Sequence, residues 1–419
     1  MARPNVPPMT GAEILDSRRS WARLAVTLAI ATVGNAGMWA IVVIMPAVQA
    51  EFSVARGDAS IPYMLTMAGF AVGNLMIGRW VDRFGITLAL IGAAITFSAG
   101  YVLAALSGSI AMLSALQFVV GFGTAACFGP LIADISHWFH RRRGIAVAIA
   151  ASGNYLSGAV WPMLLAGVLA EQGWRAVYLV LAVSSVVLIV PLALLLRSRV
   201  PTEAAAAAAS AAEARLRRAS FSPRTLQALL AVAGLGCCMA MAMPQVHIVS
   251  YCTDLGYGPA VGAEMLSLML LCGVVSRLAS GLLADRLGGV MTLLIGSVLQ
   301  MIALFLYLPF DGLASLYVVS AIFGLAQGGI VPSYALIVRE FLPAKEAGAR
   351  VGFVIMMTIV GMGLGGWSSG LIYDATGSYG LAFLAGIAWN GLNIAIMVLI
   401  LLASRRSDGG GAQRVAAAA

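Results

Sequence analysis

Stretches of about 20 consecutive apolar residues recur along almost the whole chain, and they limit the folds that it can adopt. A helix of that length crosses the ~30 Å hydrocarbon core of a lipid bilayer. The chain has 419 residues, of which 61% are hydrophobic and 10% are charged, whereas soluble domains carry about 25% charged residues. A transmembrane β-barrel would show alternating segments of about ten residues instead. The sequence therefore predicts an all-α, multi-pass membrane protein.

Twelve segments have this length and composition, and they fall into two sets of six. The first set predicts a six-helix bundle over residues 22–196, and the second predicts another over residues 224–403. Between them lies a basic, alanine-rich segment, 197–223, which we interpret as a cytoplasmic linker. Residues 1–21 and 404–419 are predicted to be cytoplasmic ends. The predicted spans are 22–47, 60–80, 86–107, 113–137, 144–168, 174–196, 225–250, 260–283, 289–308, 313–338, 349–372 and 379–403.

Basic residues predict the orientation of the spans, because cytoplasmic loops carry an excess of Lys and Arg. Of the 25 Lys and Arg residues, only Arg56 and Arg175 fall in loops on one side, Arg277 falls inside a span, and the others fall on the opposite side. This bias predicts cytoplasmic termini and accounts for the net charge of +8 without nucleic-acid binding. The chain is rich in Ala, Gly and Arg and poor in Lys, which is typical of a GC-rich bacterial source. We therefore expect a bacterial inner membrane.

Two sequence landmarks occur twice at nearly the same offset. The pattern GxxxDRxG begins at Gly78 and again at Gly281, 203 residues later. A second landmark runs from Pro130 to Phe139 and from Pro332 to Phe341, at an offset of 202. Two unrelated landmarks whose offsets agree to within one residue indicate a duplicated six-span unit, whose copies run parallel because an even number of spans separates them. The fixed positions of the pattern are Gly78, Asp82, Arg83 and Gly85 in the first copy and Gly281, Asp285, Arg286 and Gly288 in the second.

The duplicated pattern is similar to the loop motif of the major facilitator superfamily, and the match in span order covers almost the full chain. The resemblance implies twelve transmembrane helices in two parallel-repeat six-helix bundles, with a central site that opens to each side in turn. It also implies that the motif latches the two halves. Physically, glycines allow a tight turn and close helix approach, while Asp82 can face a helix N-terminus and Arg83 can anchor among lipid headgroups.

Arg277 is the basic residue that lies deepest in a predicted span. An ionisable group at that depth costs several kcal/mol and generally lines a pathway or binds an ion. The positions one helical turn away, Gly273 and Gly281, offer no carboxylate. We therefore expect Arg277 to bind an anion that comes and goes. The alternative is permanent pairing with Asp134, with Glu264 or with a carbonyl across the bundle.

Three features resemble the branch that contains monocarboxylate transporters and oxalate/formate antiporters. They are the stretch 137–158, with an aromatic pair, a basic cluster and a glycine-rich span; the stretch 244–256; and the position of Arg277 in span 8. The branch implies a carboxylate substrate held by Arg277. The chemistry agrees, because the planar guanidinium matches a carboxylate in bidentate fashion.

The chain also departs from this branch. Oxalate carriers have a second cation in span 11 where this sequence has Thr358, which favours a monoanion over a dianion. The branch often has a tyrosine in span 4 where this sequence has Phe128, and animal monocarboxylate transporters have an acid at the position of Gly273. The proton-coupling groups of the animal proteins therefore do not carry over intact. We expect a small monocarboxylate resembling lactate or pyruvate.

Further candidate residues follow from position in the spans. Tyr334 lies at a depth comparable with Arg277 and, together with Phe128, is predicted to shape the substrate pocket. Asn35 is a polar group in an apolar span, where it contacts substrate or joins helices by hydrogen bonding. His247 and Asp254 lie seven residues apart near the outer end of span 7. Because free imidazole titrates near pH ~6.5, we expect this pair to take part in proton entry; the alternative is an interfacial histidine beside a water-exposed acid.

We therefore predict a secondary active transporter that moves a small carboxylate anion together with a proton, as a monomer in the lipid bilayer. Proton symport is favoured because an anion entering a negative-inside cell needs a compensating cation. Anion exchange and drug efflux are the rival transport functions, and a membrane sensor without transport is the rival from another class. The five cysteines show no metal-ligand spacing, so we predict no metal site and no cofactor, and no nucleophile–base cluster suggests an enzyme.

Overall fold

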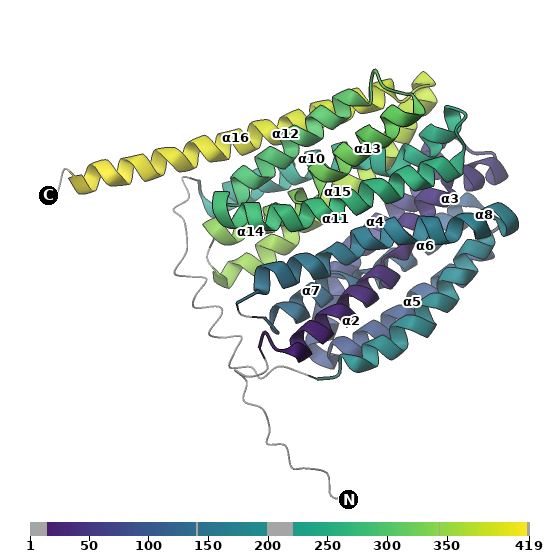
Figure 1. The fold of residues 1–419 in the computed structure, drawn as a ribbon, viewed down its shortest axis with the longest axis horizontal. Coiled ribbons are helices and arrows are strands. Elements are labelled where there is room, and N and C mark those ends of the chain that lie inside the picture. The colour runs from purple at the N-terminus through teal and green to yellow at the C-terminus, as the bar shows by residue number, and fades with distance from the viewer. Residues whose placement is uncertain (1–14, 140, 199–220, 343, 417–419) are drawn as a thin grey trace, which may run out of the picture.

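The computed structural model describes residues 15–139, 141–198, 221–342 and 344–416, which form helices joined by short loops (Figure 1). Residues 1–14 of the predicted N-terminal segment and most of the predicted linker lie outside the described residues. The helical elements are α2 (Arg18–Gly34), α3 (Ala36–Phe52), α4 (Arg56–Phe84), α5 (Ile86–Ala105), α6 (Ile110–Thr124), the 3-10 turn η1 (Ala125–Cys127), α7 (Gly129–Ser136), α8 (Arg143–Leu195), α10 (Pro223–Asp254), α11 (Pro259–Leu287), α12 (Gly289–Leu306), α13 (Leu313–Gln327), α14 (Ile330–Phe341), α15 (Ala344–Thr376) and α16 (Gly380–Ala416).

Among the described residues, eleven helical segments are long and apolar enough to cross a membrane. Helices suit this setting because a backbone surrounded by lipid must satisfy its hydrogen bonds internally. Helix α8 has 53 residues and contains one non-helical residue, Gly173, with φ 80° and ψ 176°. At 1.5 Å per residue it would be about 80 Å long if straight, far more than one crossing needs. It therefore forms two spans, which brings the crossings to the twelve predicted from the sequence.

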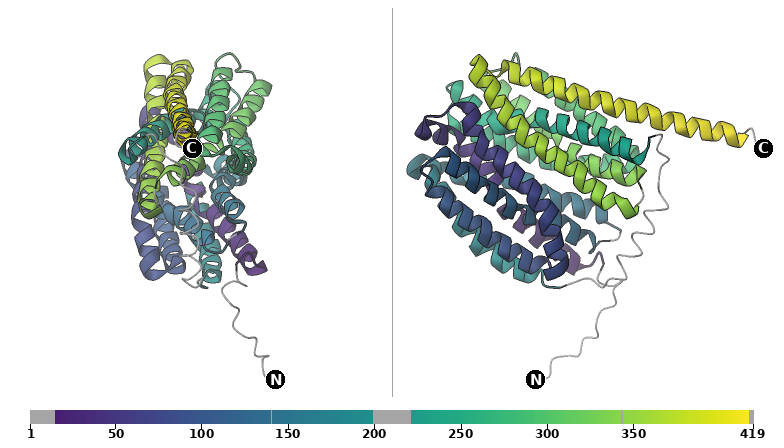
Figure 2. Two further views of the ribbon diagram at one scale, coloured as in Figure 1. Left: turned by 90° about the vertical axis from the view of Figure 1, so that its left-hand side faces the viewer. Right: turned by 180° about the vertical axis from the view of Figure 1, so that it is seen from behind.

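The twelve crossings form two six-helix bundles with the same order of helices, the architecture that the sequence predicted. In Figure 2 the purple and blue helices gather in one half and the green and yellow helices in the other. Within the first half, α4 packs against α6 and α8 packs against α2 and α5; within the second, α10 packs against α16 and α11 against α13. Between the halves, α4 packs against α15 and α8 against α11. These two helix pairs form most of the boundary between the bundles.

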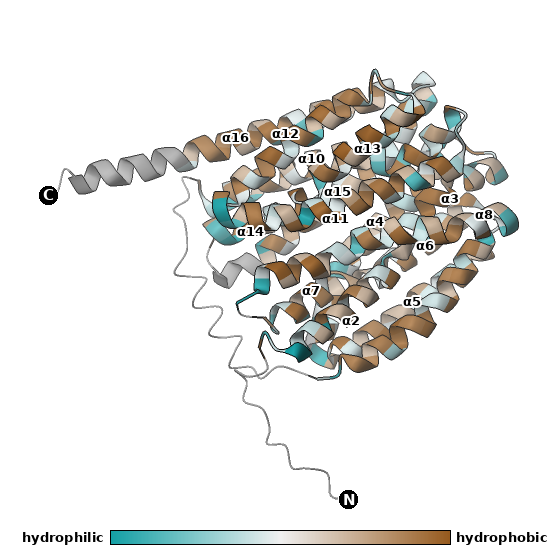
Figure 3. Ribbon diagram, in the orientation of Figure 1, coloured by the Kyte–Doolittle hydropathy of each residue, from teal (hydrophilic) through white to brown (hydrophobic). Residues whose placement is uncertain are grey.

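The surface around the bundles is apolar, as a lipid-facing surface must be. Large side chains such as Leu88, Met163, Val183 and Leu282 are more than half exposed, at 61%, 65%, 64% and 64%. Figure 3 shows that hydrophobic residues run along the helices while hydrophilic residues gather near their ends. Such a surface suits contact with the hydrocarbon core of a bilayer.

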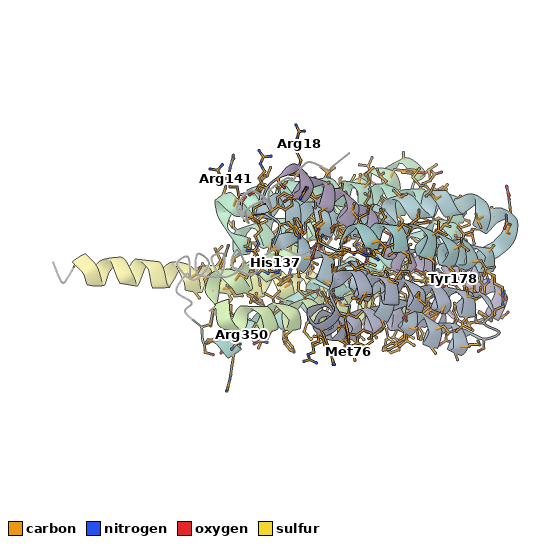
Figure 4. All side chains as sticks on the ribbon, turned by 90° about the horizontal axis from the view of Figure 1, so that it is seen from below. Arg18, Met76, His137, Arg141, Tyr178 and Arg350 are labelled. Carbon is orange, nitrogen blue, oxygen red and sulfur yellow. The ribbon has the colours of Figure 1, made fainter. Side chains whose placement is uncertain are left out.

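The two ends of the helices differ in charge. We call the end at which α2 begins and from which α16 extends the terminal end, and the opposite end the far end. Figure 4 shows Arg18, Arg141 and Arg350 toward the terminal end, with side chains that point away from the body of the molecule, and Tyr178 toward the far end. Three of the basic residues that the sequence assigned to one side therefore lie toward one end of the fold.

Three crossings are broken near their middle, which frees backbone groups inside the protein. The first crossing breaks at Asn35, between α2 and α3. The fourth breaks at Phe128, between η1 and α7, and the tenth breaks at Gly328 and Gly329, between α13 and α14. Non-helical backbone at membrane depth is tolerated where protein surrounds it or where it lines a cavity. The breaks thus supply buried carbonyl oxygens close to the boundary between the halves.

Candidate functional site

A cavity of ≈ 80 Å³ lies between the two halves. It is large enough for several water molecules and much smaller than the ~300–1,000 Å³ pockets that hold drug-sized ligands. Helices of both halves contribute to its wall, so a ligand bound here touches both bundles. The lining residues are Met38, Trp39, Tyr63, Met67, Phe70, Phe128, Asn154 and Tyr155 from the first half and Cys238, Met241, Gln245, Arg277, Val331, Ile355, Thr358, Ile359 and Met362 from the second.

Arg277 lines this cavity and is only 5% exposed. Its Nε donates a hydrogen bond to the carbonyl of Gly328 at 3.1 Å, in its own half, and its Nη1 donates to the carbonyl of Ala151 at 2.6 Å, in the other half. The guanidinium carbon lies 4.0 Å from the centre of the Tyr155 ring. Among the described residues, Nη2 has no carbonyl or carboxylate partner. The guanidinium thus borders the cavity with two carbonyls and Tyr155 as its partners and with no carboxylate among the described residues.

The sequence left three kinds of partner open for Arg277: Asp134, Glu264 or a carbonyl across the bundle. The structure shows that its partners are carbonyls. The carboxylate of Asp134 forms an ion pair with Arg23 at 2.8 Å, and that of Glu264 accepts a hydrogen bond from Tyr317 at 2.6 Å. Both acids are thus engaged elsewhere. The positive charge of Arg277 has no counter-ion among the described residues.

The Gly328 carbonyl is available because the helix is broken at that residue. A Cβ atom on Gly328 would lie 2.3 Å from the carbonyl oxygen of Gly273 and 2.6 Å from the backbone nitrogen of Arg277. Both distances are far below van der Waals contact, so only glycine allows the broken crossing to approach α11 this closely. The glycine thus places the carbonyl that orients the guanidinium.

The first half has a neutral counterpart of Arg277. Asn74 precedes the first glycine of its GxxxDRxG copy by four residues, as Arg277 does in the second copy. Its Nδ2 donates to the Phe70 carbonyl at 2.8 Å, and a Cβ on Gly129 would lie 2.6 Å from its Oδ1. Both residues thus lie against a broken crossing, but only the second half has a charge there.

The other predicted substrate residues occupy different surroundings. Phe128 lines the cavity, with its ring centre 5.8 Å from that of Phe70. The hydroxyl of Tyr334 donates to Asn393 at 2.7 Å, and Asn35 donates to the carbonyls of Ala31 at 2.7 Å and Cys127 at 3.3 Å. Neither Tyr334 nor Asn35 is among the residues that line the cavity. In this conformation both join helices, and their contact with substrate stays a prediction.

Sequence reasoning missed three aromatic residues that line this cavity, Trp39, Tyr63 and Tyr155. Tyr63 and Tyr155 bring hydroxyl groups to the cavity wall, and the indole of Trp39 donates to Oδ1 of Asn154 at 3.1 Å. Tyr63 is 1% exposed, and its hydroxyl has no hydrogen-bond partner among the described residues. Aromatic residues in apolar spans are usually packing residues, so the sequence offered no signal that distinguished these.

At the far end, a cluster of polar residues joins the halves. The guanidinium of Arg56, from the first half, donates to both carboxylate oxygens of Asp254 at 3.0 and 3.1 Å. The carboxylate of Asp374 accepts from the backbone N–H groups of Arg56 at 2.8 Å and Gly57 at 2.7 Å, at the N-terminus of α4, where a negative charge is favourable. We call Arg56, Asp254, Asp374 and Tyr379 the clasp.

His247 is connected to the clasp through Tyr379. Arg56 donates to the Tyr379 hydroxyl oxygen at 2.7 Å, and that oxygen lies 3.0 Å from Nδ1 of His247. Nε2 of His247 lies 2.7 Å from the Gly366 carbonyl, which can only accept, so Nε2 carries a proton. Tyr379 then donates to Nδ1. The predicted pair of His247 and Asp254 is thus linked through two residues that the sequence did not single out.

The sequence assigned Arg56 to an outer loop. This assignment is incomplete, because the residue also begins a helix and is buried. Arg56 is the first residue of α4 and is only 7% exposed. Its guanidinium also lies 4.6 Å from the centre of the Tyr373 ring. Burial follows from the opposing half, which covers the residue with carboxylates and aromatic rings that a single helix could not supply.

Comparison with known proteins agrees with this architecture. The family model described as Major Facilitator Superfamily matches residues 27–314 and 230–417. The chain belongs to the major facilitator superfamily. It is therefore a member of a transporter family and not an enzyme.

Several superfamily members resemble the chain in sequence. "Monocarboxylate transporter 13" of Bos taurus is 27% identical over 335 residues, covering 79% of this chain and 76% of that protein. "Monocarboxylate transporter 11" of Mus musculus is 30% identical over 342 residues, covering 76% and 72%. "MFS-type transporter pynF" of Aspergillus niger is 24% identical, covering 80% and 77%. These relatives confirm the resemblance to monocarboxylate transporters that the sequence motifs indicated.

A solved structure shares the superfamily fold. It is described as a bacterial homolog to human lysosomal transporter, Spinster, in an inward-facing and occupied conformation. The TM-score is 0.67 at 16% identity, and the match covers 92% of this chain and 95% of that one. At this level of identity the likeness concerns the fold alone.

The superfamily motif makes the same turn in both halves. Gly85 has φ 84° and ψ 162°, and Gly288 has φ 80° and ψ 169°, a backbone conformation that favours glycine. The first glycine of each copy, Gly78 or Gly281, has no atom within 4 Å of an added Cβ, so close helix approach does not explain it here. The side chain of Asp82 lies outside the described residues, and the latching role of the motif stays a prediction.

Proposed function

We propose that this protein is a secondary active transporter that carries a small monocarboxylate, of the size of lactate or pyruvate, together with a proton. The observation that carries the proposal is Arg277, a buried arginine without a counter-ion, on the wall of a cavity shared by both halves. A buried, uncompensated charge costs several kcal/mol, and an anionic substrate would offset that cost whenever it is bound.

The geometry of Arg277 supports a link between binding and movement of the halves. A carboxylate in the bidentate arrangement occupies two of the guanidinium nitrogens, and Nε and Nη1 already donate to carbonyls. Because Nη1 carries two N–H groups, a bound carboxylate that uses Nη2 and Nη1 would share Nη1 with the Ala151 carbonyl of the opposite half. Substrate would then compete with a direct tether between the bundles and weaken it, which supports alternating access.

A single charge in the cavity supports a monoanion. Thr358, at the position of the second cation in oxalate carriers, lines the same cavity and brings no charge. Its hydroxyl donates to the Ile355 carbonyl at 2.7 Å. A second carboxylate would therefore enter an apolar wall without a partner, at a cost of several kcal/mol.

Proton coupling supplies the driving force, and we place it at the clasp. Moving one anion against the membrane potential costs about 2.3 kcal/mol per 100 mV, which a co-transported proton removes. Protonation of Asp254 would cancel the charge that holds Arg56 and so loosen the far end. Tyr379 and His247 extend the hydrogen-bonded chain from the clasp into the second half. The location in a bacterial inner membrane, the cytoplasmic terminal end and the monomeric state belong to the same proposal, supported by the basic residues at that end.

The test is uptake of labelled lactate, pyruvate and propanoate into proteoliposomes, with and without an inward proton gradient. Arg277→Ala should abolish uptake of whichever acid the wild type carries. Arg224→Ala is the matched control, because it removes an exposed arginine from the start of α10 in the same half. Uptake by Arg277→Ala at the wild-type rate would contradict the proposal. Counterflow with preloaded acid but no response to a gradient would identify an exchanger instead.

A further inference from the structure

The wall of the cavity is apolar except near Arg277. Met38, Met67, Met241 and Met362 line it together with the paired rings of Phe70 and Phe128. Methionine side chains are unbranched and adapt to the shape of an apolar partner. A ligand held by Arg277 at one end would therefore place the rest of its body against hydrocarbon and thioether groups.

The other polar side chains of the wall are largely engaged within the protein. Oδ1 of Asn154 accepts from Trp39, the Thr358 hydroxyl donates to a backbone carbonyl, and Nε2 of Gln245 donates to Gln327. The remaining Oε1 of Gln245 has no partner but is buried away from the cavity surface. These side chains thus offer little to a polar group on the body of a ligand.

Two donors on the wall suit the carboxylate end of a ligand. The guanidinium of Arg277 can only donate, and the hydroxyl of Tyr63 on the same wall is a further donor. A carboxylate has about four lone-pair sites, so it can accept several hydrogen bonds. Recognition in this cavity is thus divided between one polar head and an apolar body.

We propose that the site selects short monocarboxylates whose body is plain hydrocarbon, such as propanoate and butanoate, over the corresponding 2-hydroxy acids. This inference rests on the proposed function and narrows its substrate class. A hydroxyl carried into an apolar wall loses its hydrogen bonds to water without replacement, which weakens binding by roughly tenfold. The small cavity, ≈ 80 Å³, limits the body to a few carbon atoms.

The experiment compares acids of matched carbon number in proteoliposomes that contain the full chain. Unlabelled propanoate and lactate, and butanoate and 2-hydroxybutanoate, compete with a labelled acid that the wild type carries. The hydrocarbon acid of each pair should compete about tenfold better than its hydroxy acid. Equal competition, or stronger competition by the hydroxy acids, overturns this inference and leaves the proposed function intact. If no monocarboxylate is carried at all, the proposed function fails and this inference fails with it.

The variant Phe128→Tyr tests whether the apolar wall causes the preference for hydrocarbon acids over hydroxy acids. The variant adds one hydroxyl to the wall, which should shift the preference toward 2-hydroxybutanoate by several-fold, since the added group can bond the substrate hydroxyl. Phe305→Tyr, at a phenylalanine that is 50% exposed on the lipid-facing surface, is the matched control and should leave the preference unchanged. An unchanged preference in Phe128→Tyr would contradict contact between this ring and the substrate.

Discussion

Arg56 and Arg277 are both buried at the boundary between the halves, yet they have opposite surroundings. They are 7% and 5% exposed, and each donates hydrogen bonds to the opposite half. Arg56 meets a carboxylate in bidentate fashion, whereas Arg277 meets carbonyls and the Tyr155 ring but no carboxylate among the described residues. A buried arginine with its own carboxylate is neutralised and joins two parts of the protein. A buried arginine without one keeps an uncompensated charge, which is why we propose that Arg277 binds the anion.

The largest effect is expected when Arg277 loses its charge. Arg277→Gln keeps hydrogen-bond donors but removes the cation, and loss of one partner of a buried charge pair costs about 2–5 kcal/mol. Half-saturating substrate concentration should therefore rise by a factor of about 30 or more, or transport should vanish. Competition by propanoate measures this, and helical content and gel-filtration profile show whether the protein is folded.

The difference between the two arginines can also be removed by giving Arg277 a carboxylate partner of its own. Thr358→Asp places an acid on the wall of the same cavity, where it would pair with the guanidinium and exclude the substrate. We expect carboxylate uptake to fall by about tenfold or more. Thr358→Asn is similar in size and neutral, so it should retain most of the uptake. Equal uptake in the two variants would show that the charge of Arg277 does not bind substrate.

Removing the carboxylate of the clasp should produce a smaller, conformational effect. Asp254→Asn leaves Arg56 without its counter-ion, and because the Asp254 side chain is 28% exposed we expect a loss of about 2 kcal/mol from the state in which the far end is closed. Spin labels at Gly108→Cys and Asp311→Cys, in far-end loops of the two halves, report the change by their separation. The variant should populate larger separations than the wild type.

The same variant tests the coupling of protons to transport. Wild-type uptake should rise when the far side is acidified, because each anion then moves with a proton supplied there. Asp254→Asn cannot take up that proton on the clasp and should lose most of this dependence while counterflow persists. The measurement is the initial uptake rate across a range of external pH. If uptake by the variant depends on pH as strongly as wild-type uptake does, Asp254 does not couple protons to transport.

The smallest effect is expected at a third arginine, Arg175. It pairs with Glu51 at 2.5 Å at the far end, but within one half and with side chains 40% and 39% exposed. Exposed ion pairs contribute about 0–1 kcal/mol. Glu51→Gln should therefore change neither the spin-label separation nor uptake. A change as large as that of Asp254→Asn would show that an arginine–carboxylate pair at this end matters whether or not it joins the halves.

The sequence predicted the spans, the duplicated unit and the depth of Arg277, because each depends on local composition or on spacing along the chain. It did not predict the clasp, since Arg56 and Asp254 are 198 positions apart and meet only when the two bundles pack. Such a contact leaves no local pattern. An arginine at the start of a span looks the same whether water or an opposing carboxylate covers it.

Rotation of the helices about their own axes was also beyond the sequence. Tyr334 has a depth that suggested the cavity, but its hydroxyl meets Asn393. Tyr63, which drew no attention, lines the cavity instead. The face that a helix presents is set by packing against its neighbours, and spans that are apolar all round carry little amphipathic signal to reveal it.

Counterflow of labelled propanoate, without any gradient, tests the central difference between the two arginines most directly. Proteoliposomes preloaded with the unlabelled acid would be compared for wild type, Arg277→Ala and Asp254→Asn. We predict exchange in the wild type and in Asp254→Asn, because both keep the charge that binds the anion, and none in Arg277→Ala. Exchange by Arg277→Ala at the wild-type rate would show that the substrate binds elsewhere.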